Sequence, residues 1–474
     1  MAENNTVFSK SQKEKIDPFV MKAAVVLAAG SIVPLLDSTM VNVAVNSVAV
    51  DLSTTVSVIQ WVITGYMLAM ALAIPVSGWA GSRFGGKRVY IFSLILFLAG
   101  SVLSSLSWNA ETLIVFRLIQ GFGAGLMFTT MQTLLVQISG GEHLGLLMSY
   151  VSIPAVMGPV LGPVLGGFIV SSLNWRWIFY VNIPVTIIAV LLTWYVVPGD
   201  KKSDNEFSMD WPGIFLLSPA IATIIYGISM VSSGGGFAGS AVLVPLGIGI
   251  LLLGVFVVRS LNLKKKPVLD LRLFRSKNFS ASCILLFLLG VVLNGAMLLL
   301  PLYFQQVRGE SVLYTGLLLI PQGIGTLLTR GWFGRLTDSF GSRQIVMVSL
   351  VMTVLGTLPF AFADEATSPL LLAAALVLRG AGIGGLFSPV MVSAYVGIEK
   401  EHISDASIAT RSLQNIGGAF GPAVLATVVG YQLQGDFVYS VRDIAGAYNA
   451  TFWWLIVLTI IGLIPALFLS VHRK

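Results

Sequence analysis

The segment Gly78 to Arg88 reads G-W-A-G-S-R-F-G-G-K-R, and the segment Gly334 to Arg343 reads G-R-L-T-D-S-F-G-S-R. Each is a short, glycine-rich, basic turn between two long apolar segments. The glycines allow a tight turn and a close helix approach, and the basic residues hold the turn at lipid headgroups. Because the copies stand about eight apolar segments apart, they predict two related six-helix halves with an inserted helix pair between them.

Apolar segments of helix length fill the rest of the chain. A bilayer crossing takes about 20 apolar residues, and on this basis the sequence predicts fourteen spans. They cover residues 20–47, 57–80, 87–106, 111–138, 145–170, 176–197, 211–231, 241–261, 279–307, 312–334, 343–364, 369–395, 404–432 and 447–471. The expected fold class is an all-α membrane protein with 14 transmembrane helices and both termini on one side.

The order of these spans predicts five regions along the chain. They are a cytoplasmic N-terminal tail at 1–19, a six-helix bundle at 20–197, an inserted transmembrane helix pair at 198–261, a basic amphipathic linker at 262–278 and a second six-helix bundle at 279–474. A surface-bound helix and a plain positive tether explain the linker equally well. Because no loop is long enough to hold a soluble domain, we expect the function inside the bundle.

Lysine and arginine concentrate on one side of the predicted bundle. With the N-terminus inside, about 22 of the 28 basic residues lie on the cytoplasmic side, as the positive-inside rule requires. Charged residues make up 10% of the chain, against roughly 25% in a soluble domain. The net charge of +7 is therefore a topology signal without implication for nucleic acid, and the expected partner is the lipid bilayer.

One short segment imitates a nucleotide-binding motif. Gly81 to Lys87 reads G-x-x-x-x-G-K, but Arg88 stands where a phosphate-binding loop has Ser or Thr. The segment also joins two apolar helices rather than a strand and a helix. We therefore expect no nucleotide, cofactor or metal, and a transport process would draw its energy from an ion gradient.

Several motifs resemble the major facilitator superfamily and, within it, the fourteen-helix drug:proton antiporters of the bacterial multidrug efflux type. The turn at 78–88 resembles the superfamily loop G-x-L-x-D-R-x-G-R-K. Further similar segments are Leu113 to Gly125 (LIVFRLIQGFGAG), Gly158 to Gly167 (GPVLGPVLGG), Leu36 to Ala44 (LDSTMVNVA), 174–179 (NWRWIF), 267–274 (PVLDLRLF) and 300–306 (LPLYFQQ). The resemblance implies a transporter rather than an enzyme, and it does not specify the substrate.

The same motifs predict residues that gate the conformational change. In relatives the acid of the loop motif latches one conformational state; Ser82 replaces it in the first copy, whereas the second copy keeps Asp338. The glycine and proline run at 155–167 predicts a hinge or seal, with ordinary small-residue packing as the alternative. The expected gating residues are Gly78, Ser82, Arg83, Gly85, Lys87, Asp338, Gly158, Pro159, Gly162, Pro163, Gly166 and Gly167.

Asp37 is the carboxylate that lies well inside a predicted span, about ten residues from the outer end. A buried ionisable residue is costly and points to function, and a carboxylate that alternates between a buried and a cation-paired environment suits proton coupling. Arg117 lies about six residues into its span, at a depth that can meet Asp37, and the resemblance assigns its position to proton coupling. The alternatives are a carboxylate that only cross-links helices and an arginine in a fixed ion pair.

Two further arginines lie in spans of the second half. Aligning the glycines of 121–125 with those of 380–384 places Arg379 opposite Gln120 rather than Arg117. A position lining the bundle interior and a structural packing role explain Arg379 equally well. Arg330 lies about one turn from the cytoplasmic end of its predicted span, where we expect its side chain to extend to the interface.

Polar and aromatic residues that interrupt apolar spans are the candidates for lining a substrate cavity. Such a mixture suits bulky amphiphiles, although each residue alone is more often involved in helix packing. The candidates are Asn42, Trp61, Tyr66, Gln132, Asn294, Tyr303, Phe304, Gln322, Gln414 and Asn415.

These observations favour a proton-coupled exporter of lipophilic, cationic drugs or other amphiphiles. Protonation of Asp37 from outside would weaken its hold on Arg117 or on a cationic substrate. The alternatives are an exporter of an endogenous metabolite or lipid-like amphiphile, and a membrane sensor or scaffold without transport. We expect a monomer in a bacterial plasma membrane, with protons and lipophilic small molecules as its partners.

Overall fold

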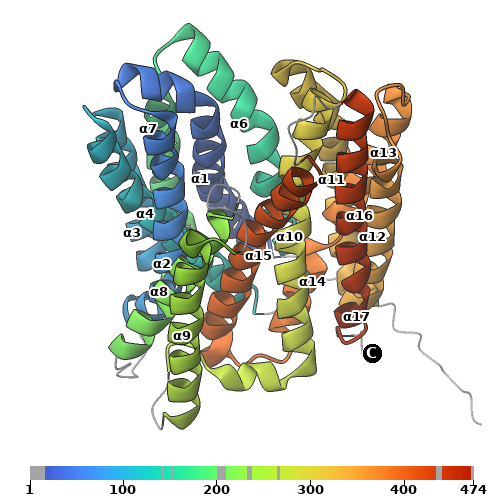
Figure 1. Ribbon diagram of the computed structural model, residues 1–474. Helices are drawn as coiled ribbons and strands as arrows, with labels where there is room; N and C mark the ends of the chain where they lie inside the picture. The colour runs from blue at the N-terminus through green and yellow to red at the C-terminus, as the bar shows by residue number, and fades with distance from the viewer. Residues whose placement is uncertain are drawn as a thin grey trace, which may run out of the picture.

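The computed structural model describes residues 17–140, 144–151, 153–199, 210–231, 238–263, 267–433 and 440–470. Within these ranges every regular element is helical (Figure 1). Residues 1–16 of the predicted N-terminal tail, residues 200–209 before α8 and residues 264–266 of the basic linker lie outside the described residues, as do the side chains of Pro159 and Pro163.

The first half contains helices α1 to α7. They are α1 Pro18–Asp51, α2 Val56–Phe84, α3 Gly86–Ser105, α4 Ala110–Ser139, α5 Leu144–Val151, α6 Ile153–Ser172 and α7 Trp177–Val196. Asn109 begins α4 with a capping box to Thr112, which satisfies free amides at the helix start. Gly85, with φ 92°, makes the turn between α2 and α3, a conformation that favours glycine.

The inserted pair consists of α8 Trp211–Ser229 and α9 Ser240–Asn262. Asp210 caps α8 and receives two hydrogen bonds from Arg259 on α9, of 2.6 and 3.0 Å, which tie the pair together. Helix α8 packs on α2 of the first half and on α15 of the second, so the pair covers one junction between the halves (Figure 1).

The second half begins with the short 3-10 helix η2 Leu271–Arg275. Its helices are α10 Lys277–Gln306, α11 Val312–Phe340, α12 Ser342–Thr357, η3 Leu358–Ala361, α13 Pro369–Gly384, α14 Phe387–Tyr395, η4 Lys400–His402, α15 Ile403–Gln432, α16 Val441–Ile461 and α17 Leu463–Ala466. The span predicted at 369–395 is thus broken into α13 and α14. Gly341, with φ 86°, repeats the turn made by Gly85.

The predicted count of fourteen spans is not confirmed. Twelve helices among the described residues are long and apolar enough to cross a membrane. The segments predicted at 145–170 and 312–334 are helical, as α5 with α6 and as α11, but they are not among these twelve. Helix α11 carries Gln322, Arg330 and Asp338 on its apolar background, which lowers its hydropathy.

The two halves repeat the same close backbone contacts. Gly121 of α4 lies against the carbonyl of Tyr66 on α2, and Gly380 of α13 lies against the carbonyl of Gln322 on α11. A side chain at either glycine would collide with backbone, so both positions require glycine. The glycine alignment of the two sequence segments therefore describes a real repeat in space.

Several contacts join the halves on one side of the bundle. We call it the basic side; it holds the turns at Gly85 and Gly341. There the Thr133 hydroxyl donates to Ser407 at 3.0 Å, and the amide of Leu146 donates to the Asp338 carboxylate at 3.3 Å. Gly78 lies directly against Ile408. The halves are therefore packed together near the basic side.

Candidate functional site

Asp37 and Arg117 form a buried ion pair inside the first half. Both side chains are almost fully buried, and Arg117 Nη1 donates to Asp37 Oδ2. Asn182 of α7 donates to the other carboxylate oxygen at 2.8 Å, and Gln120 of α4 donates to it at 3.2 Å. Helices α1, α4 and α7 thus meet at one carboxylate, and Arg117 lies at the predicted depth.

Three members of this network were not predicted as site residues. Gln120 also accepts from Arg117 at 2.7 Å, and Ser101 of α3 accepts from Gln120 at 2.7 Å and from Asn182 at 3.0 Å. Each is a lone polar residue in an apolar helix, which is a weak sequence signal. Their common depth in three different helices is the pattern that would have indicated a shared site.

Aromatic rings enclose the Arg117 guanidinium. Its carbon lies 4.2 Å from the ring centre of Tyr66 and 5.7 Å from that of Phe179. Tyr66 is buried and its hydroxyl lies 3.4 Å from the carbonyl oxygen of Pro34, so in this structure it packs against the ion pair, and its role in lining a cavity stays a prediction. The rings exclude water, which strengthens every electrostatic interaction at the pair.

The packing of this arrangement depends on the charge of Asp37. A buried pair is stable only while both charges and their hydrogen bonds are present. Protonation of Asp37 would remove its negative charge and leave the Arg117 guanidinium without an anionic acceptor. Since Asp37 of α1 accepts hydrogen bonds from residues of α4 and α7, a change in its charge would alter the packing of three helices.

The cavity candidates fall into different environments. Trp61 is 42% exposed and stacks on Tyr226 of α8 at 5.7 Å, and Asn42 is exposed. Asn294 is exposed on α10 and donates to the Gly290 carbonyl of its own helix at 3.1 Å. The stacking of Trp61 on Tyr226 brings α8 of the inserted pair against α2, a contact that the sequence analysis did not predict.

Tyr303 is a core residue of the second half. It is fully buried among Phe360, Tyr448 and Phe452, and its hydroxyl donates to the Asp364 carbonyl at 3.1 Å. In this structure it packs inside an aromatic cluster, and its place in a substrate cavity stays a prediction.

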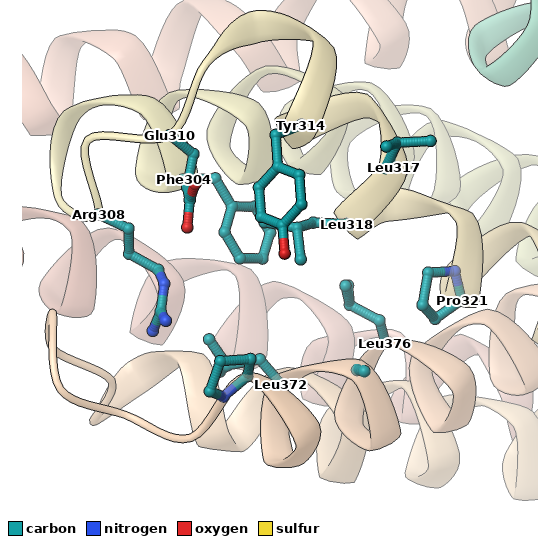
Figure 2. Close-up of a pocket in the computed structure, with 11 residues that line it drawn as sticks. Phe304, Arg308, Glu310, Tyr314, Leu317, Leu318, Pro321, Leu372 and Leu376 are labelled. Carbon is teal, nitrogen blue, oxygen red and sulfur yellow. The ribbon is translucent and has the colours of Figure 1, made fainter.

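Phe304 lies at a small pocket of the second half, away from the junction of the halves. Figure 2 shows the pocket between α10, α11 and α13, with Arg308, Glu310 and Tyr314 around it. Its volume is about 100 Å³, and Arg308 also donates to the Thr367 carbonyl at 2.7 Å. A bulky drug needs several times this volume, so the pocket in this form does not hold one.

Gln322 accepts a hydrogen bond of 2.7 Å from Arg379, which also donates to Thr357 at 3.2 Å. Gly356 lies against the backbone of Arg379 as Gly100 lies against that of Gln120. Arg379 is buried, and no carboxylate among the described residues forms an ion pair with it. The alignment of Arg379 with Gln120 agrees with this geometry.

Arg330 does not extend to the membrane interface. Helix α11 continues to Phe340, so Arg330 lies deeper than expected, and it is only 5% exposed. Its Nε and Nη1 atoms have no hydrogen-bond partner in the part of the chain that the structure describes. The expectation of an interfacial side chain is wrong because the helix is longer than the predicted span.

Gln132, Gln414 and Asn415 lie on helices that meet between the halves. Gln132 of α4 is buried and Gln414 and Asn415 of α15 are half-buried. Gln414 accepts from Arg411 at 3.2 Å. Their surroundings differ from those of the Asp37 pair, which lies within the first half alone.

The gating residues of the loop motifs behave differently in the two copies. Ser82 donates to the Trp79 carbonyl of its own helix at 2.9 Å, whereas Asp338 accepts from Leu146 across the junction. Lys87 donates to the carbonyls of Trp194 and Val197 at 2.7 Å, and Arg83 is exposed. Both copies therefore contact the other half, the second through the Asp338 carboxylate and the first through Gly78 against Ile408.

The glycine run of α6 lies against α1. Gly158 contacts Leu35, Gly162 contacts Thr39 and Gly166 contacts Met40, while Gly167 faces open space. The Thr39 hydroxyl also donates to the Gly158 carbonyl at 3.1 Å. Three small residues thus bring α6 and α1 backbone to backbone within the first half.

The chain belongs to the Major Facilitator Superfamily, whose family model matches residues 27–422. It is 35% identical over 425 residues to the multidrug resistance protein B homolog of Mycobacterium tuberculosis, covering 89% of this chain and 78% of that protein. It is 28% identical to the multidrug export protein EmrB of Haemophilus influenzae, covering 89% and 83% of the two chains. It is 27% identical to the lincomycin resistance protein LmrB of Listeria innocua, covering 88% and 87%.

Solved structures agree on the fold. A double-tryptophan mutant of XylE superposes with a TM-score of 0.71 at 14% identity and covers 96% of this chain and 97% of its own. The protein is therefore a membrane transporter of a superfamily branch that contains bacterial drug exporters, and not an enzyme.

Proposed function

We propose that the protein is a proton-coupled exporter of lipophilic small molecules, with Asp37 as the proton-carrying carboxylate and Arg117 as its modulator. The buried pair between these residues is the observation that carries the proposal. The names of its relatives, which include multidrug export and lincomycin resistance proteins, support a drug as the substrate class.

The cycle we propose alternates access between the two sides of the membrane. If the basic side is cytoplasmic, as the charge distribution predicts, the contacts of Thr133 with Ser407 and of Leu146 with Asp338 close the cytoplasmic side. A proton entering from outside would then reach Asp37, break its bond to Arg117 and favour reopening toward the cytoplasm.

The available energy is sufficient for export. One charge crossing the membrane contributes about 2.3 kcal/mol per 100 mV, and one pH unit contributes about 1.4 kcal/mol. A total proton-motive force near 150 mV therefore supplies roughly 3.5 kcal/mol per proton, enough for a concentration ratio of a few hundred.

The charge of the substrate needs separate consideration. A cationic drug would have to compete with Arg117 for Asp37, because that carboxylate is already paired. Export of an endogenous amphiphile uses the same machinery and stays an alternative, as does a sensor or scaffold without transport.

The test uses purified protein in proteoliposomes with an interior pH dye and an imposed pH gradient. Ethidium should trigger proton movement in the wild type and in Glu365→Gln, an exposed loop acid, but not in Asp37→Asn. Ethidium-dependent proton movement that survives in Asp37→Asn would reject Asp37 as the coupling residue. A wild type that moves no protons with any drug tested would favour the scaffold.

A further inference from the structure

The side chains of helix α15 change from buried to half-buried about one turn beyond its contact with the first half. From Ile403 to Thr410 its side chains are buried, except for half-buried Ser404, and they include the residues that touch Gly78 and Thr133. Arg411 comes next and is half-buried, about 12 Å along the helix from Ile403. On α15, Arg411 is therefore the first charged side chain beyond the residues that contact the first half.

The Arg411 guanidinium reaches across to the first half without meeting an acid. Its carbon lies 4.6 Å from the ring centre of Phe128 on α4, and Nη1 donates to Gln414 at 3.2 Å. None of the ion pairs between described residues includes Arg411. A ring face and one amide oxygen are weak compensation for a full charge at this depth.

Unpartnered polar atoms continue the same two helix faces. Asn415 lies one turn beyond Arg411, and its Nδ2 donor has no partner among the described residues. Gln132 lies one turn from Phe128 on α4 in the other direction, next to Thr133 at the closed contact; it is 3% exposed, and its Oε1 acceptor has no partner in the same part of the chain. Buried polar atoms are normally satisfied, so the Nδ2 donor of Asn415, one turn from Arg411 on the same face of α15, points to a ligand between α4 and α15.

The other buried arginines of the second half indicate the charge of this ligand. Arg379 and Arg330 are buried in α13 and α11 and likewise form no ion pair with a described acid. Three embedded arginines make this half attractive to anions and repulsive to cations. The embedded acid of the first half, Asp37, is already paired.

We propose that Arg411 and Asn415 bind the negatively charged group of an amphiphilic anion between the halves. Phe128 would pack on the apolar body of the ligand. This inference rests on the proposed export function and adds a substrate class to it, a lipophilic acid in its ionised form, beside the cation used in the transport assay. A charged donor binds such an anion more strongly than a neutral one.

Binding of three pyrene probes to the full-length protein in detergent tests this assignment. 1-Pyrenebutyrate is anionic, 1-pyrenebutyramide is its neutral analogue and 1-pyrenemethylammonium is cationic. Energy transfer from the ten tryptophans to pyrene reports binding. The wild type should bind the butyrate about tenfold more tightly than the amide, as expected for one charge-assisted hydrogen bond.

Substitutions at Arg411 and Asn415 test which side chains produce the preference for the butyrate. Arg411→Gln should remove the preference for the butyrate while affinity for the amide changes less than about twofold, and Arg411→Lys should keep part of it. Asn415→Leu should weaken butyrate binding a few-fold. Arg442→Gln, at an exposed position at the start of α16, should behave as the wild type. Retained amide binding shows that a variant is folded.

A preference for the butyrate that persists in Arg411→Gln would overturn the proposal, as would tighter binding of the ammonium probe to the wild type. Because this assay needs no gradient, its result does not depend on proton coupling. Proton movement with ethidium but no anion preference would leave export standing and remove the anion site. An anion preference without ethidium-driven proton movement would support the anion site and count against proton-coupled export.

Discussion

Arg379 occupies in the second half the position that Gln120 occupies in the first. Each backbone rests on a glycine of the neighbouring helix, Gly356 for Arg379 and Gly100 for Gln120. Gln120 bonds to a carboxylate, whereas Arg379 bonds to the neutral side chains of Gln322 and Thr357. The repeat therefore keeps the packing while the charges differ: the first half holds a paired acid, and the second holds Arg379, which forms no ion pair with a described acid.

Arg117→Gln should destabilise the protein strongly because it leaves the Asp37 carboxylate buried without its cation. Removal of one partner from a buried pair costs about 3–5 kcal/mol. The double variant Asp37→Asn, Arg117→Gln should recover most of this loss. Thermal unfolding in detergent measures both effects. Equal melting temperatures for the single and double variants would show that the pair is not coupled.

Asn182→Ala should lower stability by about 1–3 kcal/mol, because Asp37 and Ser101 both lose a buried donor. The matched control is Thr186→Val on the same helix, whose hydroxyl bonds only to the Asn182 carbonyl of its own helix. The control should cost less than about 1 kcal/mol. A comparable loss of melting temperature in both variants would contradict a special role for Asn182.

Gly78→Val should impair closure of the basic side, because the new side chain would collide with Ile408. Gly81→Val is the control, since a Cβ at Gly81 meets no atom within 4 Å. Ethidium efflux from cells should fall several-fold in the first variant and stay near the wild-type rate in the second. Normal efflux with Gly78→Val would mean that this contact is not part of the cycle.

Asp51 provides a pH-dependent stabilisation at the opposite side. The hydrogen bond from the Trp175 indole, followed by that from Arg176, lowers the pKa of Asp51. A lowered pKa adds stability above the ordinary value near 4 and loses it as pH falls further. Asp51→Asn should lower the melting temperature at pH 7, with a cost below about 1 kcal/mol, and this difference should shrink as the pH falls below about 4. A constant difference between pH 7 and pH 3 would exclude this linkage.

The agreement between sequence and structure is greatest where the physical cause is local. Apolar length predicted most helices, and the glycines at 85 and 341 marked turns whose φ values of 92° and 86° favour glycine. Depth along a single helix was enough to bring Asp37 and Arg117 to the same level. The same reasoning placed Arg330 too close to the membrane interface, because α11 continues to Phe340, beyond the predicted end of its span at residue 334.

By itself, the sequence determined the helical membrane fold, the internal repeat and the embedded charges, because the bilayer imposes length, hydropathy and charge rules on each segment separately. Only the tertiary structure decided which side chains meet. Asn182, Gln120 and Ser101 converge on Asp37 from separate helices, Tyr303 enters an aromatic core, and Arg411 faces Phe128 across the halves. These relations depend on the rotation of each helix about its axis, which packing between helices sets.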